Sequence, residues 1–276
     1  MTTATPAAPA SHIHHASNIR LTTGGILRSE WIKLRTLRST VWAYAIMLLV
    51  QIGFGLLLVS ISVGRAGFAQ SAAAGDAGGI ATFGAVSGVA FGQLIVSVLG
   101  VMVIAGEYTT GQIRSSLVAV PKRLAVLWAK IVVFGVVTFI VSLVGILLTY
   151  LVTSPILAGS GVSSSLFDDG VFLTFVGAAG YLALVGILAL FIGAVLRSTA
   201  GGIAVSLGLL LVAPGVFSLI PADWAHSVSD WLPGSAGGSI YQSGGTFEWW
   251  QALLIVIGWI VVVGAAAATL LRRRDA

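Results

Sequence analysis

Long apolar stretches alternate with short polar segments along the chain. Six stretches of at least 23 residues carry no charged residue: 39–64, 77–106, 131–167, 170–196, 198–222 and 249–271. A helix needs about 20 residues to cross a hydrocarbon core roughly 30 Å thick. Because the apolar runs are continuous rather than alternating, they exclude a transmembrane β-barrel. The pattern predicts an all-α integral membrane protein with six transmembrane helices.

We place these spans near residues 40–63, 83–105, 125–152, 171–196, 200–219 and 248–271. With the segment before them they make one predicted transmembrane domain, residues 24–276. Residues 1–23 are rich in Ala, Thr, Ser and Pro, and we expect a disordered cytoplasmic tail. The first long apolar run starts only after Arg38, so a cleaved signal peptide is not expected.

Composition agrees with a membrane protein. Hydrophobic residues make up 57% of the chain and charged residues 8%, against roughly 25% charged residues in soluble domains. The mean hydropathy is +1.04. These values exclude an ordinary cytosolic enzyme and a disordered chain. Cysteine is absent, which excludes disulfides, cysteine-ligated metals and a thiol nucleophile. The tail histidines His12, His14 and His15 could suggest a metal site, but a solvated tail is the simpler interpretation, and we expect no metal.

The cations predict the orientation. If the N-terminus is cytoplasmic, 13 of the 14 Lys and Arg residues lie on the cytoplasmic side and only Arg65 lies outside. Six of the nine acidic residues then lie outside. This matches the positive-inside rule and predicts a multi-pass plasma-membrane protein with both termini in the cytoplasm. The net charge of +5 is therefore an asymmetry across the membrane rather than a nucleic-acid-binding surface.

Residues 24–38 predict an amphipathic elbow helix at the inner membrane surface. Leu27, Trp31 and Leu34 share one face, which we expect in the acyl boundary, with the cations among anionic headgroups. The candidate interface residues are Trp31, Lys33, Arg35 and Arg38. The alternative is a plain basic anchor that only sets the topology.

Small and polar residues within the spans suggest helix contacts. Gly84, Gly88 and Gly92 recur every four residues and would let a neighbouring helix approach closely. Packing within the chain is the favoured interpretation, and a dimer seam is the alternative. Gln51 and Gln93 lie near mid-span, where buried amides seek partners in the bundle interior. Structural hydrogen bonding is favoured for them over contact with a substrate.

The segment 221–248 is too long for a tight turn and too apolar for a free loop. It carries Trp224 and Trp231 but no Lys or Arg, which suits a helix at the outer membrane surface. An interfacial or re-entrant hairpin there would make both tryptophans candidates for an outer gate. A passive aromatic belt is the equal alternative.

The loop 106–130 is the one sizeable internal loop between spans. Glu107 stands at a membrane exit, followed by Arg114, Lys122, Arg123 and Lys130. The loop reads either as a short helix along the inner surface, bounded by Gly111 and Pro121, or as an ordinary positive-inside loop.

These features together resemble the permease subunits of type-2 ABC exporters, the ABC-2 family. The matching residues are Gly106-Glu107, Gly111, Ile113-Arg114, Leu117, Pro121, Arg123 and Lys130. The elbow, the six spans and the hairpin between the last two also match, so the similarity covers residues 24–274. Gln112 departs from the threonine that is frequent in the family.

The resemblance implies that the loop is a coupling helix docking on a separate ABC ATPase. The docking residues would be Glu107, Arg114, Pro121, Lys122 and Arg123. It also implies a second permease copy, as a homodimer or with a paralogue, and contact with membrane lipid.

The scarcity of ionisable residues within the spans also favours transport driven by a partner ATPase. An ion-driven carrier normally needs an ionisable residue inside the membrane. Lys130 alone approaches this, and we expect it to snorkel to the inner face. The chain has no Gly-Lys dipeptide and thus no phosphate-binding P-loop. ATP and Mg²⁺ would bind to the partner, and this chain would bind no cofactor.

The sequence therefore predicts a non-enzymatic permease subunit of an ATP-driven exporter for an amphiphilic drug, antimicrobial peptide or lipid-like cargo. An intramembrane protease is disfavoured, because His226 is the one histidine beyond the tail and lies in the external loop. A non-transporting membrane partner, such as an immunity or scaffold protein, is the alternative.

Overall fold

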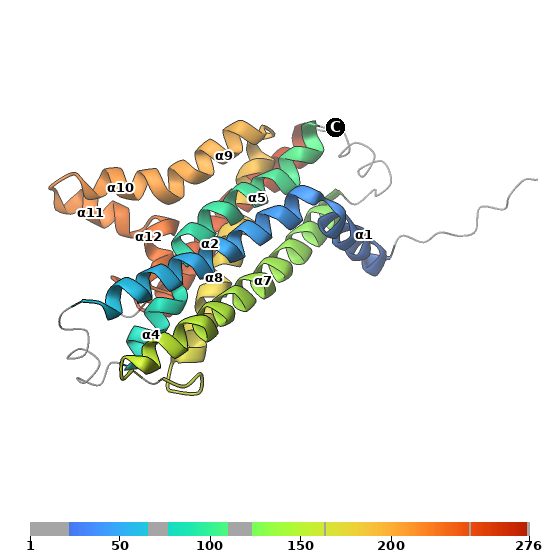
Figure 1. The fold of residues 1–276 in the computed structure, drawn as a ribbon. Coiled ribbons are helices and arrows are strands. Elements are labelled where there is room, and N and C mark those ends of the chain that lie inside the picture. Colours follow the sequence, from blue (N-terminus) through green and yellow to red (C-terminus); the bar gives the residue numbers. More distant parts are fainter. Residues whose placement is uncertain (1–21, 66–76, 110–122, 163, 243, 275–276) are drawn as a thin grey trace, which may run out of the picture.

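The computed structural model describes residues 22–65, 77–109, 123–162, 164–242 and 244–274. Every regular element in these ranges is a helix (Figure 1). The helices are α1 (Thr23–Thr36), α2 (Arg38–Val63), α4 (Ala77–Val86), α5 (Val89–Thr109), α7 (Arg123–Gly159), α8 (Val171–Leu196), α9 (Thr199–Leu207), η1 (Gly208–Val212), α10 (Ala213–Ser218), α11 (Asp223–Asp230), α12 (Pro233–Gly238) and α13 (Trp249–Arg274).

Six helical segments are long and apolar enough to cross a membrane. They are Arg38–Val63, Gly78–Tyr108, Ala125–Gly159, Val171–Leu196, Thr199–Ser218 and Trp249–Leu271. The predicted all-α fold with six spans is confirmed. The third span is longer than expected, because α7 continues to Gly159 with Pro155 inside it. A proline removes one helical hydrogen bond, and near a helix end that loss need not stop the helix.

The second span is interrupted between α4 and α5. A Cβ on Gly88 would lie 2.6 Å from the Cα of Gln51 on α2, so the two backbones are in contact at the interruption. The Ser87 hydroxyl donates to the Gly84 carbonyl over 2.9 Å, which gives that carbonyl a hydrogen-bond partner near the break. The span is therefore two helices joined where it meets α2.

The fifth span changes its winding at η1. Pro214 has no N–H to donate to the carbonyl of Leu210 one turn earlier. The helix instead widens into a π-turn, in which the Ala213 N–H donates to Gly208. The Leu210 carbonyl lies against Gly234, leaving no room for a side chain there. The first turn of α12 thus packs against the fifth span at the π-turn that Pro214 causes.

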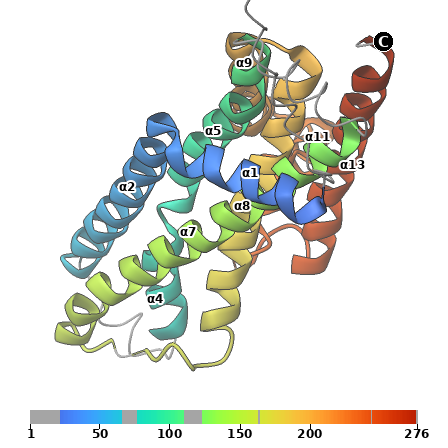
Figure 2. The same cartoon turned by 90° about the vertical axis from the view of Figure 1, so that its right-hand side faces the viewer.

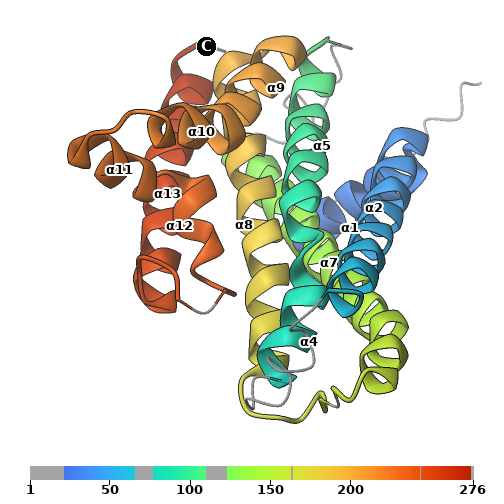
Figure 3. The same cartoon turned by 60° about the vertical axis from the view of Figure 1, so that its left-hand side comes forward.

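Helix α8 is the centre of the bundle. Within its apolar window 72% of residues are buried, against 22% for α2 and 11% for α13. It packs against α5, α7 and α13. Figure 3 shows α5 and α8 standing between α1, α2 and α7 on one side and α9 to α13 on the other.

One end of the bundle collects several helix ends. The C-terminus of α5, the N-terminus of α7, the turn between α8 and α9 and the C-terminus of α13 all lie at the same end of the bundle as α1 (Figure 1). Leu34 of α1 and Leu271 of α13 belong to the same buried apolar cluster. We call this the junction end.

Candidate functional site

Helix α1 lies across α7 at the junction end rather than continuing α2 (Figure 2). Its N-terminus is capped by the Thr22 hydroxyl, which accepts from the Gly25 N–H over 3.2 Å. At its other end Leu37 adopts an extended conformation, with φ −71° and ψ 110°, before α2 begins. The extended residue turns the chain, so that α1 presents Glu30 and Leu34 to the bundle as its buried residues.

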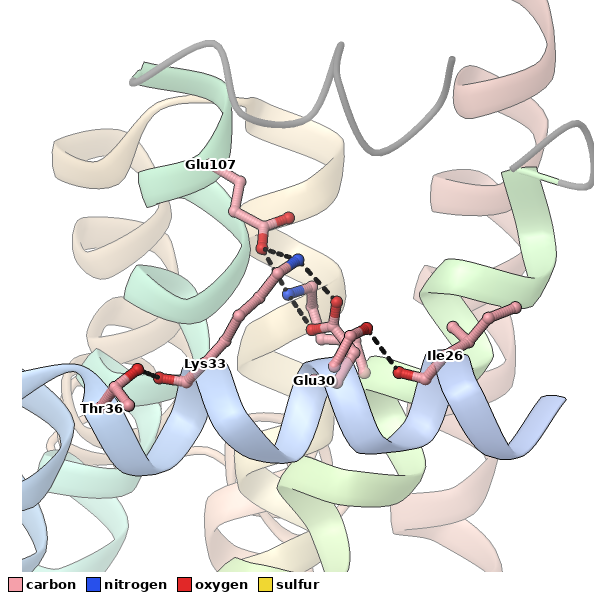
Figure 4. Close-up of polar contacts among 7 residues, drawn as sticks. Ile26, Glu30, Lys33, Thr36 and Glu107 are labelled. Carbon is pink, nitrogen blue, oxygen red and sulfur yellow. Dashed lines mark hydrogen bonds and ion pairs between the residues drawn. The ribbon is translucent and has the colours of Figure 1, made fainter. Parts of the chain in front are cut away.

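Four charged side chains from three helices meet beneath α1. Lys130 of α7 donates to Glu30 over 2.7 Å and to Glu107 of α5 over 2.8 Å. Lys33 donates to the same two carboxylates, over 2.7 Å to Glu30 and 3.1 Å to Glu107. Figure 4 shows Glu30, Lys33 and Glu107 pointing toward one another from α1 and α5. We call Glu30, Lys33, Glu107 and Lys130 the four-charge junction.

The junction is mostly withdrawn from solvent. The side chains of Glu30 and Lys130 are each 3% exposed and that of Glu107 is 9% exposed, whereas Lys33 reaches the surface at 35%. Burying such charges is unfavourable unless each is paired and hydrogen-bonded. Two ammonium groups face two carboxylates here, so the junction is neutral as a unit.

The pKa values of the α1 residues reflect this pairing. Burial alone would raise the pKa of Glu30, but the ammonium groups of Lys130 and Lys33 outweigh burial and hold it below its ordinary value. Burial alone would lower the pKa of Lys33, but Glu30 and Glu107 outweigh it and raise that pKa above its ordinary value. Both residues are therefore charged over the physiological range.

We expect the contributions of Glu30 and Lys33 to stability to be constant across a wide pH range. For Glu30 that contribution is complete above its ordinary pKa of 4.5 and is lost as the pH falls through the lowered folded-state pKa. For Lys33 it is complete below 10.5 and is lost as the pH rises through the raised folded-state pKa. Thermal unfolding of the wild type and Glu30→Gln should differ by a constant amount near neutrality and converge in acid. Lys33→Met should converge with the wild type in alkali. A difference that changes between about pH 6 and pH 8 would contradict this assignment.

A second contact joins the end of α5 to the turn after α8. The Arg197 guanidinium lies 5.0 Å from the centroid of the Tyr108 ring, a cation–π geometry. Arg197 ends α8 in a left-handed conformation, and Ser198 caps α9 through the Gly201 N–H. The last turn of α5 therefore contacts α1 and α7 through Glu107, and the α8–α9 turn through Tyr108.

The expected docking residues are only partly described. Arg114, Pro121 and Lys122 lie outside the described residues, and Arg123 is the first residue of α7. The carboxylate of Glu107 is turned inward to Lys33 and Lys130, and its role in docking stays a prediction.

The expected elbow residues divide into two groups. Trp31, Arg35 and Arg38 are exposed, whereas Lys33 belongs to the junction. Leu34, expected in the acyl boundary with Leu27 and Trp31, is instead buried against the bundle at 6% exposure. The buried residues of α1 toward the bundle are thus one charged residue, Glu30, and one leucine, Leu34.

The glycine stripe faces other helices of the same chain. A Cβ on Gly84 would lie 2.6 Å from Val59, and Gly88 meets Gln51, both on α2. A Cβ on Gly92 would lie 3.4 Å from Leu182 of α8 in ordinary contact. After the interruption the stripe therefore meets α8 as well, while Met47 of α2 still lies 3.9 Å from that Cβ position.

The two mid-span amides have different surroundings. Gln93 accepts a hydrogen bond from the Tyr181 hydroxyl of α8. Gln51 is fully buried, and neither amide atom has a hydrogen-bond partner in the described part of the chain.

Of the two candidate gate tryptophans, Trp224 lies in the first turn of α11 and Trp231 directly follows its last residue, and both are exposed. Trp224 packs edge-on against Phe217 at a centroid distance of 6.3 Å. The carbonyl of Trp231 accepts from the indole N–H of Trp259 on α13 over 3.0 Å, which ties the hairpin to the last span. Among the described residues no group of three or more His, Asp or Glu side chains could hold a metal.

Sequence reasoning missed Glu30, and it assigned Lys130 to snorkelling, whereas that ammonium is buried in the junction. A signal was available. Glu30 is the one acid on a basic helix and stands three residues before Lys33. Glu30 and Glu107 are also two of only three acidic residues placed on the cytoplasmic side.

Comparison with known families decides the identity. The profile of the ABC-2 family transporter proteins matches residues 26–213, which is more than half of the chain. The chain belongs to the ABC-2 transporter family. The match runs from α1 to the start of α10, so it includes the whole junction. No curated protein matches this ABC-2 chain. Membership supports a multi-pass permease that is not itself catalytic and, in general, an ABC ATPase as partner.

Proposed function

We propose that this ABC-2 chain is the permease subunit of an ATP-driven exporter, coupled to a separate ATPase through the loop between α5 and α7. One observation carries the proposal: the ion pair between Glu107 and Lys130, at 2.8 Å, links the end of α5 to the start of α7. The helices on either side of the loop are thus tied to each other and, through Glu30, to α1.

The mechanism follows from these contacts. ATP binding would close the ATPase dimer and displace the loop. Because Glu107 and Lys130 are paired and buried, α5 and α7 would move together instead of separating. Tyr108 would pass the movement to the turn after α8 through Arg197. Two permease copies would enclose the path, which would open at the outer side near Trp224 and Trp231.

The orientation proposed is the one with the junction end in the cytoplasm. The strong excess of Lys and Arg on that side supports it, as does the exposed basic surface of α1. Both termini would then be cytoplasmic, and the plasma membrane is the expected location.

The energy source proposed is ATP, bound with Mg²⁺ on the partner. The six candidate spans contain three Asp, Glu, Lys or Arg residues, Arg38, Glu107 and Lys130, all at the junction end. Ion-coupled carriers place ionisable groups near the midplane, where they bind the coupling ion. The spans are rich in Leu, Val, Ala and Phe, which favours an amphiphilic drug, antimicrobial peptide or lipid-like cargo.

Charge reversal tests the coupling. Arg114→Glu with Arg123→Glu should weaken co-purification with the candidate ABC ATPase and its stimulation by about tenfold or more, the scale of losing interfacial charge contacts. Arg65→Glu reverses a single charge on the opposite side and should leave both unchanged. Glu107 is unsuitable for this test, because its reversal would break the junction whatever the partner. Unchanged binding and stimulation in the double variant would overturn the assignment.

A non-transporting role, as an immunity or scaffold protein, is the alternative. Reconstitution with the ATPase separates the two, since the proposal requires ATP-dependent movement of an amphiphilic probe across the vesicle membrane. ATPase binding without any such movement would favour the alternative.

A further inference from the structure

A cavity opens beside the four-charge junction, between α1, the first turn of α2 and the last turns of α5. Its volume is about 650 Å³. Its lining has three basic residues, Lys33, Arg38 and Lys130, against the two acids Glu30 and Glu107, and so carries one net positive charge. The two acids are already paired with the two lysines.

Arg38 is the cation that the cavity leaves uncompensated. It is exposed and forms no ion pair within the described ranges. It begins α2, whose N-terminus has no side-chain cap. The positive end of the helix dipole at this N-terminus favours an anion. Lys33 adds a partly exposed ammonium, which uses two of its three protons on the carboxylates.

The opposite wall of the cavity is apolar. Leu99, Met102 and Val103 of α5 line it, and Met102 is 40% exposed. Polar and apolar walls meet at the point where the candidate span of α2 starts. An occupant that satisfies both walls carries an anionic group joined to a hydrocarbon chain. This is the chemistry of the lipids present at such a boundary.

We propose that this cavity binds one anionic phospholipid. Its phosphodiester lies at Arg38 and the exposed edge of Lys33, and an acyl chain runs along Leu99, Met102 and Val103. The bound lipid fills the space between α1 and α5 and so stiffens the contact that the junction makes. This inference does not depend on the identity of the ATPase or the cargo.

The test measures retention of lipid by the full chain in nanodiscs of phosphatidylcholine, with and without phosphatidylglycerol. Phosphatidylglycerol should raise the thermal midpoint of the wild type by about 2–4 °C, the shift expected for a stabilising contact in a chain of this size. Native mass spectrometry should show one retained phosphatidylglycerol. Arg38→Gln should weaken retention about fivefold, as for one lost cation at a lipid surface, and should remove the thermal shift.

Arg35→Gln is the matched control, since Arg35 is an exposed cation of α1 that does not line the cavity. It should retain the lipid as the wild type does. Met102→Trp fills the apolar side of the cavity and should also lose the lipid. Because it leaves Arg38 in place, its result does not depend on any folding defect of Arg38→Gln. Equal loss in both arginine variants, or wild-type retention in Arg38→Gln, overturns the site. Inorganic phosphate in pure phosphatidylcholine should give no shift, and a full shift from phosphate overturns the lipid as the occupant.

Discussion

Replacing Lys130 with methionine should lower the free energy of unfolding by about 3–5 kcal/mol, the cost of removing one partner from a buried ion pair. The change leaves Glu30 and Glu107 facing each other, with only the half-exposed Lys33 between them. Neither carboxylate can reach bulk water in the folded state, because their side chains are 3% and 9% exposed. Equilibrium unfolding in mixed micelles measures the loss.

Two comparisons make this prediction specific to charge. Lys33→Met removes the more exposed cation and should cost much less, because water can solvate the carboxylates through the gap it leaves. Adding Glu30→Gln and Glu107→Gln to Lys130→Met should restore most of the stability, since an uncharged buried set avoids the desolvation cost. Equal losses in the two lysine variants, or no recovery in the triple variant, would contradict the assignment.

The sequence predicted the spans because charge is excluded from the membrane whatever the details of packing. The fourth span shows this, since residues 171–196 were expected and α8 is Val171–Leu196. Helix interruptions were harder to foresee. The break at Ser87 and Gly88 depends on the approach of Gln51 from a different helix. The π-turn depends on Pro214, which the sequence shows. The close approach of Gly234 to the Leu210 carbonyl at that turn cannot be read from the sequence.

The junction shows why polar sites in such a protein escape pattern analysis. Periodicity assigns apolar residues to the buried face, so Leu27, Trp31 and Leu34 were placed together. The buried face of α1 instead includes Glu30, which pairs with Lys130, 100 positions away. Lys130 in turn pairs with Glu107 of α5. Only the folded bundle brings these helices together. The one signal in the sequence was that few acids were expected on the cytoplasmic side, and two of those few, Glu30 and Glu107, belong to the junction.

The second large effect is expected at Gly100, where α5 meets α8. A Cβ there would clash with the carbonyl of Gly186 and lie 3.2 Å from the backbone N of Leu190. Both obstacles are backbone atoms, so no side-chain rotation can relieve the overlap and α5 must move away from the central helix. Gly100→Ala should therefore lower the free energy of unfolding by about 3 kcal/mol, the upper range for overpacking. It should also reduce ATP-dependent transport if α5 and α8 move as a unit.

Gly106→Ala is the control on the same helix, because a Cβ there would have no atom within 4 Å. Alanine is the better helix former by about 1 kcal/mol, so this variant should be neutral or slightly stabilised. The contrast separates close backbone contact from the general effect of removing glycine. Loss of stability at Gly106 equal to that at Gly100 would mean that chain flexibility, and not the contact between α5 and α8, sets the requirement for glycine.

If Gly100→Ala leaves the free energy of unfolding unchanged, α5 and α8 are not packed backbone to backbone. The bundle then lacks the rigid centre through which movement of the loop would reach the outer side.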